Sequence, residues 1–256
     1  MKKYGLTGFI RYCKLTSEQP SIAIIGDSHA SMLFYGVAEA LKNDERGVVN
    51  LGGRLFVDVA TYPIGNTFEM DVYRGGIQAT KFVAQEKTID TVVLASRAPS
   101  SFDTDDHNVF ALISDPTITD RKRVWEIGLR KTLDQFYGTK KEIIFFLDIP
   151  DLDFDPYLCV RPLSLSSKKE NCAVPAADYR TRFSAYRGLV ESVLKDYPKV
   201  KVFDAAAYLC DQNWCRARVN GAVAYGDRDH LSVEGSRYIG NELARVLNGE
   251  NSKIYR

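Results

Sequence analysis

Short continuous runs of apolar residues alternate along the chain with segments whose apolar positions recur at helical spacing. The apolar runs predict buried strands at 22–25, 91–95, 143–147 and 200–203, with two further candidates, 48–51 and 55–60, around Gly52-Gly53. The segments with helical spacing predict helices at 32–41, 77–85, 124–136, 179–195 and 232–247. We expect five strands and about five helices, in an order typical of an α/β domain whose parallel sheet carries helices on its faces.

Two stretches interrupt this alternation. Residues 99–119 are polar, rich in Asp and without periodicity, and residues 148–177 form a long loop with four of the nine prolines. Residues 1–20 are also less regular, so we expect an extension that packs on the domain or links it to something upstream. Residues 21–250 then form one domain, because 256 residues with 45% hydrophobic content suit a single large core.

The charge balance is nearly neutral, with a formal net charge of +1. The short basic run at 121–123 is interpreted as a solvated helix start, so no nucleic-acid partner is expected. No stretch approaches the roughly 20 apolar residues that cross a bilayer. Residues 1–20 also lack the apolar segment of a signal peptide.

Four of the five cysteines form two local pairs. Cys159 and Cys172 flank a polar loop, and four residues separate Cys210 from Cys215, so each pair can close a disulfide while Cys13 is left over. Two disulfides imply an oxidising compartment such as the bacterial periplasm; the alternative is five reduced cysteines in a cytosolic protein. Only three histidines accompany them, so we predict no zinc site, no other metal and no cofactor.

Ser28 follows the first predicted strand directly, in the turn Gly26-Asp27-Ser28-His29. A serine between a strand and a helix can point its hydroxyl out of the sheet, and the helix N-terminus supplies backbone N–H groups. Gly26 allows the sharp turn. Taken alone, this pattern is weak, because Asp and Ser are also common helix caps.

Asp227 and His230, near the other end of the chain, strengthen the interpretation of Ser28 as a nucleophile. A serine hydroxyl needs a base beside it at neutral pH, and the base needs an acceptor that fixes its tautomer. Asp and His three residues apart, at the start of the predicted helix 232–247, can supply both from one short segment. We therefore predict Ser28 as nucleophile, His230 as base and Asp227 as orienting acid.

These motifs resemble the SGNH (GDSL-like) hydrolase superfamily. More narrowly, they are similar to the C-terminal SGNH domain of bacterial acyltransferase-3 membrane proteins, which O-acetylate surface polysaccharides. The matching segments are Gly26-Asp27-Ser28-His29-Ala30, Leu94-Ala95-Ser96-Arg97 and Tyr225-Gly226-Asp227-Arg228-Asp229-His230-Leu231-Ser232. The resemblance implies a flavodoxin-like three-layer α/β/α sandwich with a five-stranded parallel sheet. It also implies the same three catalytic residues, with the Asp229 side chain diverging from His230.

The oxyanion hole departs from the superfamily pattern, which usually has an Asn after the third strand. Here that strand leads into Ser96-Arg97, without an Asn. The backbone N–H of Ser28 remains available, and either Gly53 or Gly65 fits the pattern for a second donor. Arg97 stands where the Asn would be, either as a donor to the oxyanion or substrate or in a surface ion pair. Losing one oxyanion donor costs about 3–4 kcal/mol of barrier, so the departure fits a transferase better than an efficient hydrolase.

Three functions compete. The resemblance favours acetyl transfer to a carbohydrate hydroxyl, such as one of O-antigen, in a periplasmic domain tethered to the inner membrane. The partner would be a membrane acyltransferase-3 domain upstream in the same polypeptide. A stand-alone carbohydrate esterase or deacetylase uses the same three residues. An inactive glycan-binding module is disfavoured because Ser28, Asp227 and His230 are all present.

His29 is interpreted as structural, because it follows Ser28 immediately and should diverge from its hydroxyl.

Overall fold

The computed structural model describes residues 13–62, 67–97, 109–160 and 172–254. Its central sheet has six strands, in the order β1-β3-β2-β5-β7-β9. The strands are β1 (Cys13–Leu15), β2 (Pro20–Gly26), β3 (Gly47–Gly52), β5 (Thr91–Ala95), β7 (Glu142–Leu147) and β9 (Lys201–Asp204). The last five run parallel, which confirms the predicted sheet. The short β1 adds an antiparallel edge strand beside β3, within the segment expected to be an extension.

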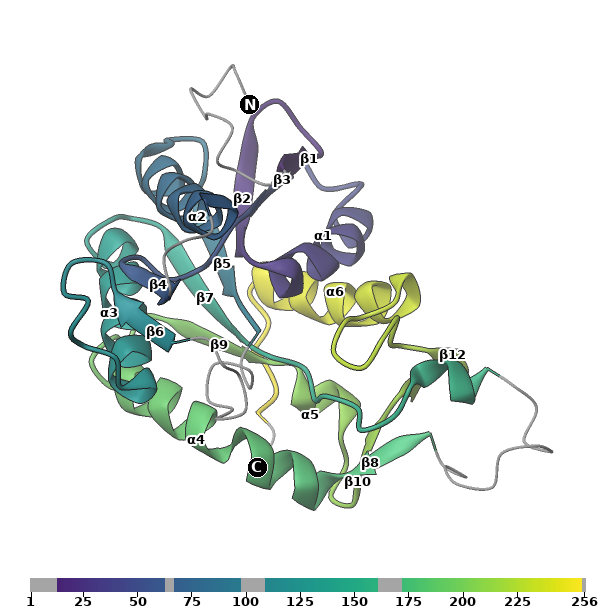
Figure 1. Ribbon diagram of the computed structural model, residues 1–256. Coiled ribbons are helices and arrows are strands. Elements are labelled where there is room, and N and C mark those ends of the chain that lie inside the picture. The colour runs from purple at the N-terminus through teal and green to yellow at the C-terminus, as the bar shows by residue number, and fades with distance from the viewer. Residues whose placement is uncertain (1–12, 63–66, 98–108, 161–171, 255–256) are drawn as a thin grey trace.

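Helices cover both faces of this sheet. They are α1 (Ser28–Ala40), α2 (Thr67–Gln85), α3 (Arg121–Tyr137), α4 (Ala176–Leu194), the short α5 (Ala206–Leu209) and α6 (Val233–Leu247). In Figure 1, α1 and α6 lie side by side on one face, while α2, α3 and α4 follow one another along the other. This is the predicted three-layer α/β/α arrangement. No helix within the described ranges is long and apolar enough to cross a membrane.

Smaller strand pairs lie outside the central sheet. The predicted strand at 55–60 becomes β4 (Val59–Tyr62), which pairs antiparallel with β6 (Val109–Leu112). The polar stretch 99–119 therefore contains a strand that its composition did not indicate. The other pairs are β8 (Ala173–Pro175) with β10 (Trp214–Arg216) and β11 (Arg218–Val219) with β12 (Ala222–Val223). A 3-10 turn, η3 (Pro156–Cys159), precedes β8.

Both predicted disulfides are present. Cys159 is bonded to Cys172 and Cys210 to Cys215, with Cα atoms 5.7 and 3.9 Å apart. Cys13 is the free cysteine, half-buried on β1.

Gly26 brings the end of β2 against the next strand. Its φ is +146°, a conformation that residues with a side chain rarely adopt, and a Cβ there would lie 1.7 Å from the Ala95 carbonyl oxygen. The close approach places Ser28 at the carboxyl edge of the parallel strands. Ligand and catalytic sites of open α/β sheets form at this edge.

A second close approach joins α1 to α6. A Cβ on Gly36 would lie 1.7 Å from the Ser236 carbonyl oxygen, and one on Gly240 would lie 2.3 Å from the Gly36 carbonyl carbon. The Gly36 N–H also donates to Ser236 Oγ at 3.0 Å. Because α1 begins at Ser28 and α6 follows shortly after His230, this packing fixes the distance between the two ends of the chain that carry the candidate chemistry.

Candidate active site

Asp27 organises the turn that carries Ser28. Its carboxylate accepts the His29 N–H at 2.9 Å and so caps α1. The same side chain accepts Ser96 Oγ–H at 2.9 Å and the Arg97 N–H at 3.0 Å. The Asp of the Gly-Asp-Ser motif therefore ties the nucleophile turn to the end of β5, a role that the motif alone did not indicate.

The structure brings the three predicted catalytic side chains together. His230 Nε2 lies 2.8 Å from Ser28 Oγ, and His230 Nδ1 lies 3.0 and 3.1 Å from the two carboxylate oxygens of Asp227. Asp227 Oδ1 also accepts the backbone N–H groups of Asp229 and His230, at 3.0 and 2.8 Å. Residues 227–230 thus form a tight turn directly before α6, whose N-cap is Ser232 as predicted.

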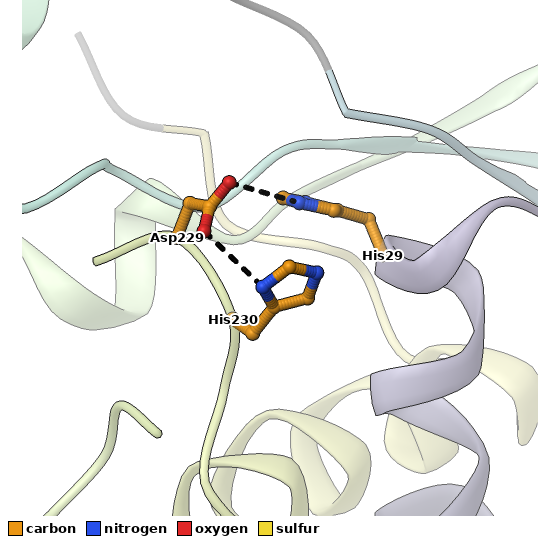
Figure 2. A group of neighbouring side chains, drawn as sticks. All are labelled: His29, Asp229 and His230. Atoms are coloured by element: carbon orange, nitrogen blue, oxygen red, sulfur yellow. Dashed lines mark ion pairs between the residues drawn. The ribbon is translucent and has the colours of Figure 1, made fainter. Parts of the chain in front are cut away.

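The expectation that the Asp229 side chain diverges from His230 is wrong. Asp229 Oδ1 lies 3.1 Å from His230 Nδ1, and its Oδ2 lies 2.8 Å from Arg97 Nη2. Figure 2 shows the Asp229 carboxylate beside both rings, with one oxygen toward His29 and the other toward His230. Neighbouring side chains diverge on a helix, but the turn held by Asp227 directs both carboxylates toward one imidazole.

His29 is fully buried behind His230. Its Nδ1 lies 2.7 Å from Asp148 Oδ1, its Nε2 lies 3.8 Å from Asp229 Oδ2, and its ring centroid lies 4.8 Å from that of His230. Burial opposes the charged imidazole, but the charge and hydrogen bond of Asp148, with the contact to Asp229, raise the pKa of His29 to about 10. The raised pKa favours the protonated form of His29 at neutral pH, where the ring lies against Asp148 and Asp229.

Asp148 was missed by the sequence reasoning. It is completely buried directly after β7, and its Oδ1 also accepts the Ile149 N–H at 2.9 Å. An Asp that follows a buried parallel strand lies at the edge where sites form, and this was the available signal. Its partner could not be identified, since 119 residues separate it from His29.

The groups around His230 shift its pKa in both directions. Contact with Asp229 is the main influence that raises its pKa above the ordinary value, and the charge of Asp227 adds to it. Partial burial and the positive charge of His29 lower it. The pKa of Asp229 is far below its ordinary value because of His230 and His29, with Arg97 adding to the effect.

The structure gives different outcomes for the three predicted oxyanion donors, Gly53, Gly65 and Arg97. The Gly53 N–H donates to the Gly26 carbonyl at 2.9 Å, so an oxyanion would have to compete for it. A Cβ on Gly53 would lie 2.6 Å from Gly76 N, which explains the glycine by packing against α2. Gly65 lies outside the described residues. The guanidinium of Arg97 forms the ion-pair alternative, with Asp229, and its oxyanion role stays a prediction.

One group of side chains in the described part of the chain resembles a metal-ligand set. The ligand atoms of His29, Asp229 and His230 lie within 4.8 Å of one another. The Arg97 guanidinium contacts Asp229, and His29 is positively charged, so two cations already compensate the carboxylate. Both oppose binding of a metal ion there.

A serine, a histidine and a carboxylate in contact on an α/β sheet are the side chains that acyl transfer through a serine ester requires. The family described as "SGNH domain (fused to AT3 domains)" matches residues 2–245, and the chain belongs to it. AT3 denotes acyltransferase-3. No functionally curated protein matches the sequence.

The fold also occurs in a solved structure. The periplasmic domain of the lipopolysaccharide acetyltransferase of Salmonella ser. Paratyphi A superposes with a TM-score of 0.59 at 19% identity, covering 91% of this chain and 85% of that one. A carbohydrate acetylesterase from Sinorhizobium meliloti gives a TM-score of 0.49 at 14% identity, covering 90% of this chain and 98% of that one. At these identities the first likeness shows the fold of the domain.

Proposed function

We propose that this domain transfers an acetyl group to a hydroxyl of a bacterial surface carbohydrate, such as O-antigen, through an ester on Ser28. The observation that carries the proposal is the contact of His230 with both Ser28 Oγ and Asp227. Membership of the family fused to acyltransferase-3 domains, and the fold shared with the periplasmic domain of a lipopolysaccharide acetyltransferase, support the substrate class.

Acylation of Ser28 would use His230 as a general base. Ser28 Oγ attacks the carbonyl carbon of the acetyl donor while His230 Nε2 takes the hydroxyl proton. Asp227 stabilises the resulting imidazolium through Nδ1. The bond to the leaving group then breaks, the leaving group takes the proton from His230, and the acetyl group remains on Ser28.

Transfer repeats the same steps with a sugar. The sugar hydroxyl gives its proton to His230 Nε2 as its oxygen bonds the acetyl carbon. The bond to Ser28 Oγ breaks, and Oγ takes the proton back. Near the oxyanion, the Ser28 N–H at the first position of α1 has no hydrogen bond within the described residues, so it can donate there.

The exposure of the site suits a large acceptor. Ser28 is exposed at the surface, and the Asp227 side chain is 58% exposed. A polymer can approach an open nucleophile without entering a deep pocket. We therefore favour a polysaccharide over a small metabolite as the acceptor.

The domain would work in the periplasm, beside a membrane acyltransferase-3 domain that delivers the acetyl group. The family description supports the fused partner. The two disulfides are consistent with an oxidising compartment. Under this proposal the domain needs no metal and no cofactor of its own, because the acyl group arrives activated.

The test supplies an aryl acetate as donor and a de-O-acetylated lipopolysaccharide glycan as acceptor. We expect acetylated glycan from the wild type and none from Ser28→Ala, with mass spectrometry of the glycan as readout. The control is Ser184→Ala, which removes an exposed hydroxyl on α4 and should leave transfer unchanged. Release of acetate at a rate that added glycan does not alter, with no acetylated glycan, would support an esterase instead.

A further inference from the structure

We infer that Asp229 is a positioning residue for His230: a second carboxylate on the Nδ1 side of the imidazole, held in place by Arg97 and by His29. The inference deepens the proposed function, since it rests on His230 as the general base. It assigns a task to three charged residues that the triad itself does not use.

Two carboxylates face one side of the same ring. Asp227 contacts His230 Nδ1 at 3.0 Å, and Asp229 Oδ1 contacts the same nitrogen at 3.1 Å. Their exposure differs: the Asp227 side chain is 58% exposed and that of Asp229 is 12% exposed. Water screens an exposed charge more than a buried one, so Asp229 exerts the stronger field on the imidazolium.

Asp229 is itself held by two cations. Its Oδ2 lies 2.8 Å from Arg97 Nη2 and 3.8 Å from His29 Nε2. Arg97 is fixed in turn, because its backbone N–H donates to Asp27 in the nucleophile turn. Figure 2 shows the Asp229 carboxylate reaching from the His230 segment toward the His29 ring on α1. Such paired contacts reduce the ways in which the carboxylate can rotate away from His230.

His29 is anchored from the core. Its second nitrogen contacts the fully buried Asp148 at 2.7 Å. Charges therefore alternate from the interior to the surface, in the order Asp148, His29, Asp229, His230 and Asp227 when His230 is protonated. Such an order stabilises the imidazolium that forms during catalysis, because each positive ring lies next to a carboxylate.

The groups around His230 come from four segments. Asp227 and Asp229 lie in its own turn, Asp27 and His29 at the start of α1, Arg97 after β5, and Asp148 and Asp151 after β7. Among them, Asp229 and His29 act on His230 in opposite directions, through contact with a negative charge and proximity to a positive one. Their removal should therefore have opposite effects, which a merely structural role would not produce.

The experiment measures the pKa of His230 by NMR titration of protein with isotope-labelled histidine, where three histidines keep assignment simple. Asp229→Asn should lower the pKa of His230 by about one pH unit. His29→Gln should raise it. The acid limb of kcat/KM for an aryl acetate should move in the same directions.

Arg182→Gln is the matched control, because it breaks another Arg–Asp pair near the site, with Asp151 at 3.0 Å, and should leave the pKa of His230 nearly unchanged.

The outcomes separate this inference from the proposed function. An unchanged pKa of His230 in Asp229→Asn would overturn the role of Asp229, whether or not the wild type is active. A wild type that titrates as expected but does not react at Ser28 would instead overturn the proposed function. If His29→Gln does not fold, Asp229→Asn alone decides, since circular dichroism and thermal unfolding identify the folded variants.

Discussion

Among the residues of the candidate site, exposure separates those that we propose to react from the charged pair behind them. Ser28 is exposed and His230 is half-buried, whereas the ion pair of His29 with Asp148 behind them is completely buried. A buried ion pair adds little net stability, but removing one partner leaves an uncompensated charge, which costs about 3–5 kcal/mol. We therefore interpret the His29–Asp148 pair as a structural support behind Ser28 and His230.

The His29–Asp148 pair predicts a pH dependence of stability. The pKa of His29 is about 10 in the folded protein and 6.5 as the ordinary value, so folding favours the protonated ring. This contribution is complete below about pH 6.5 and is lost as the pH rises toward 10. Urea unfolding of the wild type should show a free energy of unfolding that declines across this range. His29→Gln should be less stable near pH 7 and should decline less; parallel pH profiles would contradict the account.

Among the elements, the crossing of α1 and α6 sets the distance between the candidate catalytic groups Ser28 and His230. The two helices meet where Gly36 contacts Ser236 and Gly240. Near the site, the Leu231 N–H also contacts Met32 Sδ at 3.3 Å, which ties the segment after His230 to α1. A change in the spacing of these helices would move His230 relative to Ser28.

Gly36→Ala tests this spacing. The added Cβ would overlap the α6 backbone, so we expect a loss of about 1–3 kcal/mol in the free energy of unfolding and a lower kcat. Gly188→Ala is the matched control, because it lies on an exposed face of α4 with open space around it. Alanine should stabilise that helix by up to about 1 kcal/mol with unchanged kcat. Equal effects of the two substitutions would show that the helix crossing is not tight.

The elements also show which parts of the fold could be predicted from the pattern of apolar residues. The buried parallel strands were predicted to within about two residues because each is dominated by a short run of apolar residues. Helix α2 begins at Thr67, ten residues before its predicted start at 77. The prediction missed its first part because Gly75-Gly76 lowers the helix propensity of the segment. Strand β1 is too short for alternation to register. The candidate strand at 55–60 corresponds to β4, whose place outside the central sheet, paired with β6, is not encoded locally.

At the scale of the whole molecule, the topology joins segments that are distant in sequence. Ser28 and His230 are 202 residues apart, yet each lies in a short motif with its own signal, so their meeting could be predicted. The role of Asp229 could not be, because it depends on Arg97 and His29 arriving from other elements. The oxyanion donors were equally difficult, since backbone N–H groups leave no mark on the sequence.

The most direct measurement is covalent labelling of the protein by a serine-directed fluorophosphonate, with the modified residue located by peptide mass spectrometry. We expect an adduct on Ser28 in the wild type and none in Ser28→Ala. Ser31→Ala, which removes the next hydroxyl on α1, should still label at Ser28. Equal labelling of the wild type and Ser28→Ala, or an adduct at another serine, would contradict Ser28 as the nucleophile.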